Sequence, residues 1–366
     1  MKRKLKKSAK IGILFLSGAV LICAGYVIYR VLDKRSKESL SLEFAQDKLV
    51  FEAKEPLPDY AGIFQSPSEF TVEGNVDIDH PGTYPLKVIV HGKDLLGRPK
   101  DSEYSCNAAV QDTTAPKLEI DETRAFILSG GEFDPLSHVI SAADTVDGDL
   151  TAISGAVYRK DQEDLTKPGE HTIVIGAKDS SGNESEASYV LATGKSVEGK
   201  NPYLIRINRV ENNVTVYMMD EDEVYSLPAR AMVCSTGTAT PIGSFNTFNR
   251  GTWRSLFGGV AGQYVTDIVG DILFHSVPYF SMDKGNLEYE EYNKLGTKAS
   301  LGCIRLCVRD AKWIFDECPI GTTVEIYDKE GDPGPLGKPE PIKIDVNDER
   351  RGWDPTDPDP ENSWNN

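Results

Sequence analysis

Apolar residues occur along this chain in three different patterns. The first is a continuous run, since residues 11–29 hold no charged side chain over 19 positions. Short alternating runs bounded by Gly, Pro, Asn and Asp then recur from residue 38 onward, which is typical of strands joined by turns. A helical period occurs once near the end, at i, i+3, i+4 and i+7, in Ala311, Ile314, Phe315 and Cys318. The patterns predict a mainly β protein with an N-terminal transmembrane helix and one covering helix.

The apolar run at residues 11–29 has the length of a membrane-spanning helix, since a hydrocarbon core of roughly 30 Å needs about 20 residues. A cleaved signal peptide would have a shorter core and a small-residue cleavage site, whereas Arg30 and two further basic residues follow this run. The basic side chains of residues 1–10 favour a cytoplasmic N-terminus. We therefore predict a cytoplasmic basic segment over 1–10 and an uncleaved anchor over 11–32 in the cell membrane, with the C-terminal bulk extracellular.

The cysteines leave two interpretations open near the anchor and indicate no disulfide framework beyond it. A lipoprotein signal ending at Cys23 is the alternative to an anchor, but Ile22 is larger than the residue that precedes the cysteine in such signals. Beyond the anchor there are five cysteines, so at least one has no intramolecular partner. Cys307 and Cys318 flank the predicted helix, about 15 Å apart at a rise of roughly 1.5 Å per residue. That separation excludes a disulfide between them.

An internal repeat occupies residues 38–195. The segment PGTYPLKVIVHGKDLLG begins at Pro81, and PGEHTIVIGAKDSSGN begins at Pro168. Each combines a Pro-Gly turn, an alternating strand and a second turn with Asp and Gly. The spacing matches one small β-sandwich per unit. The DTTAP join after Gln111 and the VDGDLT stretch resemble bacterial immunoglobulin-like modules, so we predict one module at 38–112 and another at 113–195.

The second module is rich in acidic residues that raise the question of a calcium site. Asp144, Asp147 and Asp149 lie close together, but their spacing does not fit the EF-hand loop. Asp side chains also stabilise turns by bonding to nearby backbone N–H groups. The sequence therefore favours a turn-stabilising role and predicts no metal.

Charge excludes one class of partner and marks the end of the chain. The net charge of −17 argues against nucleic-acid binding, which needs clustered Lys and Arg. The segment 331–366 repeats Pro and acidic residues, as in GDPGPLGKPEPIK and DPTDPDPENS. Such a composition is typical of disorder. We predict a mostly disordered tail, with docking of Trp353 or Trp364 as the structural exception.

The third region, 201–330, contains the residues that could perform chemistry. Its histidine, His275, ends an apolar strand and is followed by Ser276, and a second segment reads SLGCIR around Cys303. A cysteine nucleophile needs a base to accept its proton, and the base needs a group that orients it. The N–H groups next to Gly302 could hold an oxyanion. Taken alone these residues prove little, because most cysteines are small buried hydrophobes.

The combination of these segments resembles the L,D-transpeptidase catalytic domain, also called the YkuD domain. The resemblance runs through His-Ser at 275–276, the SLGCIR segment at 300–305 and STGTATPIGSF from Ser235, within about 201–328. It implies a cysteine-dependent acyltransferase with Cys303 as nucleophile, His275 as base and Ser276 as the group that orients it. The implied reaction joins peptidoglycan stem peptides, the donor and the acceptor, by 3→3 cross-links through a thioester. No cofactor is implied.

The resemblance also assigns supporting roles near the nucleophile. Gly302 and Ser300 belong to the oxyanion or substrate site. Arg305 either binds a substrate carboxylate or braces the loop that carries Cys303. Trp253 and Tyr264 could line the cleft, although core packing is the simpler expectation.

Two features depart from the family pattern. Leu301 stands where the family usually has histidine, which leaves His275 as the one available imidazole. The segment between the two motifs is longer than usual and contains YFSMDKGNLEYEEYNKLG, at residues 279–296. This segment is either a lid or cleft wall, or a plain surface loop.

Two other functions remain open at this stage. A carboxypeptidase would use the same acyl-enzyme but transfer it to water, so that stem peptides are trimmed. A non-catalytic wall-binding scaffold would tolerate loss of Cys303. Product analysis distinguishes the enzymes, and the Cys303→Ala variant distinguishes both from the scaffold.

Overall fold

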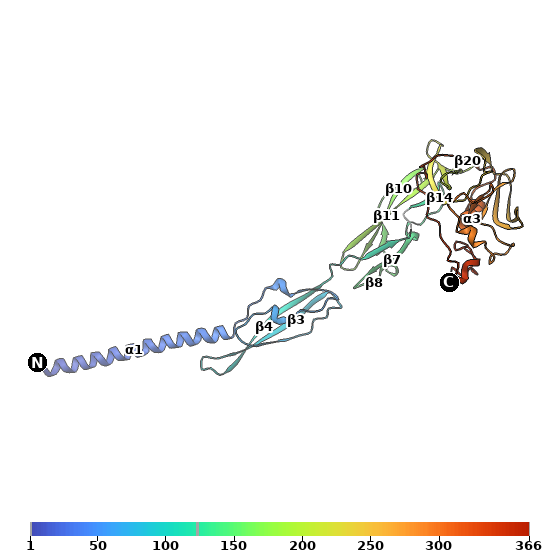
Figure 1. The fold of residues 1–366 in the computed structure, drawn as a ribbon. Coiled ribbons are helices and arrows are strands. Elements are labelled where there is room, and N and C mark those ends of the chain that lie inside the picture. Colours follow the sequence, from blue (N-terminus) through green and yellow to red (C-terminus); the bar gives the residue numbers. More distant parts are fainter. Residues whose placement is uncertain (1, 122–123, 366) are drawn as a thin grey trace. The chain divides into compact units, whose positions relative to one another are not determined.

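The computed structural model describes residues 2–121 and 124–365, with side chains from residue 20 onward (Figure 1). The chain divides into two compact units. The first unit contains 1–119, 140–157 and 176–186, and the second contains 120–139, 158–175 and 187–366. The predicted boundaries at 38, 113 and 201 stay predictions.

The first helix, α1 (Lys2–Ser39), includes the whole of the predicted anchor. Across the part of the chain that was described, no helix combines the length and the apolar character needed to cross a membrane. The side chains of residues 11–19, about half of the predicted span, lie outside the described residues. The anchor at 11–32 therefore stays a prediction.

A mixed sheet, with one parallel and two antiparallel strand pairs, forms the body of the first unit. Its strands, in spatial order, are β1 (Val50–Glu52), β4 (Pro99–Gln111), β3 (Gly82–Lys93) and β2 (Phe70–Glu73). The two long strands lie side by side and pair from Gly82↔Val110 to Lys93↔Pro99 (Figure 1). Their inward side chains, such as Val88, pack with Leu49 and Phe64 from the irregular segment that precedes and follows β1. The predicted first sandwich is thus a single sheet, because residues 40–66 cover it with loops and short 3-10 helices instead of a second sheet.

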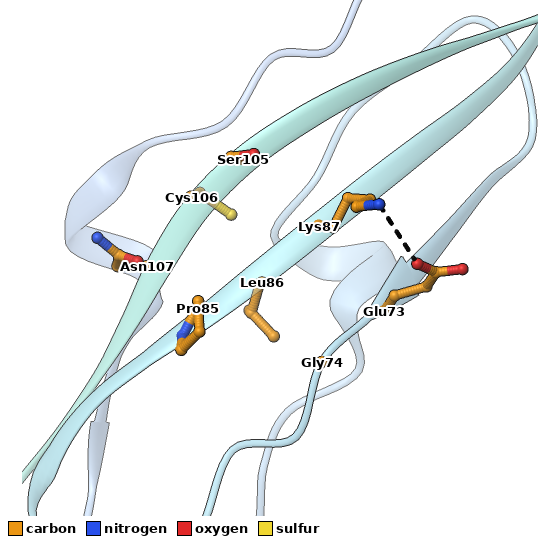
Figure 2. A pocket seen from close by; sticks show the side chains of 8 residues that line it. All are labelled: Glu73, Gly74, Pro85, Leu86, Lys87, Ser105, Cys106 and Asn107. Atoms are coloured by element: carbon orange, nitrogen blue, oxygen red, sulfur yellow. Dashed lines mark ion pairs between the residues drawn. The ribbon is translucent and has the colours of Figure 1, made fainter.

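A hollow of about 450 Å³ lies on this first sheet (Figure 2). Lys87 and Glu73 form an ion pair at 3.9 Å beside it. Cys106 also lines the hollow, and burial raises the pKa of its thiol. A thiol in that environment is not activated as a nucleophile.

Residues 117–194 form two further sheets. The four-stranded sheet has the order β6 (Arg124–Leu128), β11 (Glu184–Gly194), β10 (Gly169–Lys178) and β9 (Val157–Arg159). The three-stranded sheet has the order β5 (Lys117–Ile120), β7 (Val139–Asp144) and β8 (Gly148–Asp149). The immunoglobulin-like assignment of 113–195 stays a prediction.

Two sheets and one helix make up the remaining part of the second unit. The five-stranded sheet has the order β14 (Tyr225–Val233), β13 (Asn213–Met219), β12 (Tyr203–Asn208), β20 (Thr323–Tyr327) and β15 (Gly243–Asn246). The four-stranded sheet has the order β16 (Arg250–Ser255), β17 (Ala261–Val269), β18 (Ile272–Ser276) and β19 (Ile304–Leu306). Helix α3 (Val308–Glu317) packs on β17 and β18, and its Ala311 and Ile314 enter one core with Ile205 and Phe274. The prediction of a mainly β protein with a covering helix is confirmed for this part.

Helix α3 begins at Val308, and Asp310 in its first turn does not cap it. Asp310 is instead a buried partner of Arg230 at 2.8 Å. The cap comes from the end of the chain, where Asp354 Oδ2 accepts a hydrogen bond from Val308 N at 2.8 Å. An acidic side chain there satisfies a free N–H and offsets the positive end of the helix. Burial raises the pKa of Asp354 to about 6 despite these favourable bonds.

The tail is therefore ordered over 331–365, and the prediction of a disordered tail is wrong. Ile344 is 2% exposed and packs with Tyr292 and Val308, while Trp364 lies against the same cluster. The acidic side chains that suggested disorder fold the tail locally, as Asp354 and other Asp residues accept bonds from N–H groups two residues ahead. Composition missed this because Asp354, Asp357 and Asp359 each accept a backbone hydrogen bond within their own turn.

The remaining short elements lie in loops. They are α2 (Tyr289–Tyr292) and the 3-10 helices η1 (Gln46–Leu49), η2 (Tyr60–Gly62), η3 (Pro135–His138), η4 (Leu150–Ala152) and η5 (Glu349–Gly352).

Candidate active site

The pairing of β18 with β19 brings the two candidate catalytic residues to one face of a sheet. The strands run parallel, with Phe274 beside Ile304 and His275 beside Arg305. Successive side chains of a strand point to opposite faces. Phe274 and Ile304 are fully buried in the core, so His275, Arg305 and the preceding Cys303 belong to the other face. All three line a cavity of about 640 Å³.

Cys303 lies directly before β19 and is partly accessible. Its Sγ donates a weak hydrogen bond to the Asp271 carbonyl at 3.4 Å. Burial raises the pKa of the Cys303 thiol, and this effect exceeds the opposing effects of the Leu273 backbone N–H and of Arg305. The resting sulfur is therefore a neutral thiol, and a nucleophilic role would require the loss of its proton.

His275 is almost completely buried, with 2% of its surface exposed. Its Nδ1 lies 2.5 Å from the Ser276 carbonyl oxygen, which can only accept a hydrogen bond. Burial lowers the pKa of His275 to about 4, although that bond acts in the opposite direction. The ring is thus neutral near pH 7, with its proton on Nδ1 and with Nε2 free to accept another.

Ser276 contributes its carbonyl and not its hydroxyl. The Ser276 Oγ accepts a bond from Gln263 N and donates to the Val277 carbonyl, both at 2.9 Å, within the core. The sequence left both possibilities open. In the structure, only the backbone of Ser276 contacts His275.

A neighbouring segment, 235–243, holds the loop that carries Cys303. Thr240 Oγ1 donates to the Gly302 carbonyl at 2.6 Å, and Ala239 N donates to the Leu301 carbonyl at 3.0 Å. Gly237 packs so closely that a Cβ there would lie 2.4 Å from backbone atoms of Ser300 and Leu301. The STGTATP motif therefore acts as a clamp on the loop.

Replacing Gly237 by Ala should displace the loop, because backbone atoms cannot move aside as a side-chain tip can. We expect kcat/KM to fall roughly 100-fold, the effect of misplacing a reacting group by about 1 Å. Steady-state assays would measure this effect. Gly251→Ala is the matched control, since its new Cβ would come no closer than 3.7 Å to any neighbour. Equal activity in both variants would contradict the clamp.

Gly302, Ser300 and Arg305 surround the nucleophile in different ways. Ser300 Oγ donates to the Cys303 carbonyl at 2.6 Å, so this hydroxyl shapes the loop. A Cβ on Gly302 would meet Ile272 Cδ1 at 2.8 Å, which explains the small residue before the cysteine. Arg305 donates to Glu291 at 2.6 Å and to the Ala299 carbonyl at 3.2 Å. The observed contacts of Arg305 are those of a brace.

The long segment 279–296 is a packed wall behind the site. Tyr279, Leu287 and Tyr292 are buried in one cluster with the tail, and none of the residues 279–296 lines the cavity. Its functional contact is Glu291, which holds Arg305. Neither a lid nor a plain surface loop describes it.

Sequence reasoning missed several residues that line the cavity. Arg254 forms two hydrogen bonds to the buried carboxylate of Asp267 beside the site. Phe248 and Phe257 expose 55% and 88% of their surface at the cavity. No strand was predicted from the sequence at 250–255 or 261–269, so nothing in it indicated that β16 and β17 border Cys303.

Trp253 and Tyr264, considered above as possible cleft residues, pack in the core. Trp253 packs edge-on against Tyr279 at 5.3 Å, and Tyr264 packs against Phe315 at 5.7 Å, so both belong to the core. Leu301 exposes 65% of its surface at the cavity rim. A histidine in place of Leu301 would also lie at that exposed rim.

Comparisons with known proteins cover this part of the chain. Residues 202–326 match the family model of the YkuD L,D-transpeptidase catalytic domain. YciB of Bacillus subtilis (strain 168), provisionally named an L,D-transpeptidase, is 44% identical over 92 residues, which are 24% of this chain and 46% of that relative. The chain thus spans about half the length of the relative it matches.

Two solved structures are also similar. A fused zinc-dependent amidase/peptidase/peptidoglycan-binding domain-containing protein from Clostridium acetobutylicum is 29% identical, with a TM-score of 0.27, and the match covers 34% of this chain and 52% of that one. An L,D-transpeptidase from Mycobacterium smegmatis is 15% identical, with a TM-score of 0.28, over 58% of this chain and 99% of that one. The family match contains both His275 and Cys303. Residues 202–326 are therefore similar to the L,D-transpeptidase catalytic domains of the YkuD family.

Proposed function

We propose that this protein is a cysteine L,D-transpeptidase that forms 3→3 cross-links between peptidoglycan stem peptides. The observation that carries the proposal is the shared cavity of Cys303 and His275, with the imidazole oriented by the Ser276 carbonyl. Both groups are neutral at rest, because burial raises the pKa of the thiol and lowers that of the imidazole to about 4. The pair is therefore suited to proton transfer during attack and not to a standing ion pair.

Acylation begins when Cys303 Sγ attacks the carbonyl of the third residue of a tetrapeptide stem. The thiol proton passes to His275 Nε2 as the C–S bond forms. The backbone N–H groups of Gly302 and Cys303 are suited to hold the developing oxyanion. His275 then gives the proton to the departing amine of the terminal D-alanine, and a thioester to Cys303 remains.

Deacylation repeats these roles with the acceptor. A side-chain amine of a second stem attacks the thioester, and His275 takes a proton from that amine. The C–S bond breaks and the proton returns to the sulfur, so the thiol is regenerated and an amide bond joins the two stems. With water as acceptor the same steps would trim the stem, which makes the product the deciding observation.

The substrate implies a location outside the cytoplasm. We place the domain at the cell wall, with the segment at 11–32 as its anchor in the cell membrane. The residues between 38 and 195 would then hold the domain away from the membrane surface.

The test is mass spectrometry of the intact protein and its products after incubation with a disaccharide-tetrapeptide. We expect the wild type to form a thioester adduct that has lost D-alanine, and a cross-linked dimer. Cys303→Ala should form neither, because it has no nucleophile. A shortened monomer in place of the dimer would identify a carboxypeptidase. A folded wild-type protein that yields no adduct and no product would contradict both enzymatic functions.

A further inference from the structure

Three carboxylates from distant parts of the sequence meet in the first unit. Asp112 directly follows β4, Asp144 ends β7, and Asp179 directly follows β10. Their side chains are 7%, 8% and 6% exposed. Each offers one ligand atom such that all three atoms lie within 4.8 Å of one another.

Two oxygens in this cluster have no partner although they are buried. Asp112 Oδ2 and Asp144 Oδ2 accept no hydrogen bond. The second oxygen of each residue is used, since Asp112 Oδ1 accepts from Thr114 N and Asp144 Oδ1 accepts from Val146 N. A buried carboxylate oxygen without a donor or a counter-charge is strongly disfavoured. The unpaired oxygens therefore indicate a missing positive group.

The described protein groups that bond to the cluster do not supply that charge. The partners of these carboxylates are backbone N–H groups and the side chain of Asn183, which donates to Asp179 Oδ2 at 2.8 Å. All of these donors are neutral. The ligand atoms of the three carboxylates nevertheless lie within 4.8 Å of one another. The site as built repels its own negative charge.

We propose that Asp112, Asp144 and Asp179 bind a calcium ion. An all-oxygen set of three carboxylates suits a hard cation, and zinc would select nitrogen or sulfur ligands. Calcium accepts irregular sets of six to eight oxygens, whereas magnesium demands octahedral geometry and usually takes one or two carboxylates. Water and nearby carbonyls can complete the shell.

The neighbouring acids explain why the sequence predicted no metal here. Asp149 accepts from Thr151 N and stabilises its own turn as expected, whereas Asp147 accepts from Ser180 N and Oγ, 33 residues further along the chain. Of the acids considered from the sequence, only Asp144 belongs to the cluster. The other two ligands come from positions 32 residues before and 35 residues after it, a separation that no loop motif records.

Calcium would hold three chain segments together at the point where β4 leads into β5. Asn183 already links two of them, because its Nδ2 donates to both the Asp112 carbonyl and Asp179. A cation shared by three carboxylates would add to this link and stabilise the folded state by mass action. The ion has a structural role, in a unit other than the one that holds Cys303.

The test is calorimetric titration of the full-length protein, first treated with EDTA, with calcium chloride. We expect one ion per chain with a Kd on the order of 10⁻⁴–10⁻³ M, the range of extracellular calcium modules, and a higher Tm in calcium. Asp112→Asn and Asp179→Asn should each weaken binding at least about tenfold and remove most of the rise in Tm. Asp149→Asn is the matched control and should bind as the wild type does.

Two results would overturn the proposal. One is a wild-type protein that takes up no calcium at about 10 mM, well above the expected Kd. The other is equal calcium affinity in Asp112→Asn, Asp179→Asn and Asp149→Asn. Since the wild-type titration is decisive alone, a variant that fails to fold does not weaken the test. Magnesium chloride in a parallel titration should produce a weaker effect.

Discussion

Replacing His275 by Gln should lower kcat/KM by roughly 10²–10⁴-fold, the usual contribution of a general base. Glutamine can still donate to the Ser276 carbonyl, which receives the Nδ1 hydrogen bond in the wild type. It cannot accept a proton, so the Cys303 thiol would have to ionise unaided in a site where burial raises its pKa. Steady-state rates of dimer formation would measure the loss, and unchanged melting would show that the fold is intact.

The pH profile separates a catalytic role of His275 from a structural one. Burial lowers the pKa of His275 to about 4, so the neutral base is present above that value and is lost as the pH falls through it. We expect the acid limb of kcat/KM near pH 4 and not near the usual histidine value of about 6.5. His275→Gln should abolish this limb.

Ser276→Ala is the control, because it retains the carbonyl that orients the ring and loses only a hydroxyl bonded within the core. This variant should melt at a lower temperature but keep the position of the acid limb. A limb that shifts in Ser276→Ala, or one that persists in His275→Gln, would show that another group titrates.

The candidate site residues could be named from the sequence where they lie together in short contiguous motifs. Cys303 and Gly302 share one segment, and the His-Ser pair at 275–276 ends a strand that begins with three consecutive apolar residues. The parallel pairing of β18 with β19 was not readable, because it joins segments separated by the long wall at 279–296. That pairing places Cys303 and His275, the proposed nucleophile and base, on one face of the sheet.

The residues that sequence reasoning missed depend on contacts between distant segments. Arg254 and Asp267 occupy neighbouring strands, and their ion pair at the cavity follows from register alone. Glu291 reaches Arg305 only because its segment folds back behind the site. Local sequence patterns do not predict such long-range contacts. They do predict strands from alternation and the helix α3 from its apolar positions.

For the tail, the composition indicated disorder, whereas the structure shows a packed segment. Repeated Asp and Pro usually mark solvated chain, but here each turn satisfies its own backbone. Few apolar residues are needed to dock such a preformed segment. Ile344 and Trp364 contact the cluster around Tyr292, and Asp354 reaches the start of α3.

Truncation after Glu330 should consequently destabilise the catalytic domain by roughly 2–4 kcal/mol. The estimate combines a buried isoleucine, worth about 1.5–3 kcal/mol, with a helix cap worth about 1 kcal/mol. For a domain of this size it corresponds to a fall in Tm of about 4–16 °C. Thermal melting of the truncated and full-length chains would measure it. An unchanged Tm would mean that the tail lies on the domain without stabilising it.

The point variant Asp354→Ala isolates the cap from the rest of the tail. Its removal leaves Val308 N without a partner and should cost about 0.5–2 kcal/mol, only part of the truncation effect. Asp348→Ala is the comparison, because it removes the cap of the short exposed turn η5 but leaves the bond to Val308 N intact, and we expect it to lower the Tm less than Asp354→Ala does. If both variants melt together, the cap does not stabilise α3. If Asp354→Ala alone lowers the Tm, the end of the chain is part of the catalytic fold, because the capped helix packs on β18, the strand that carries His275.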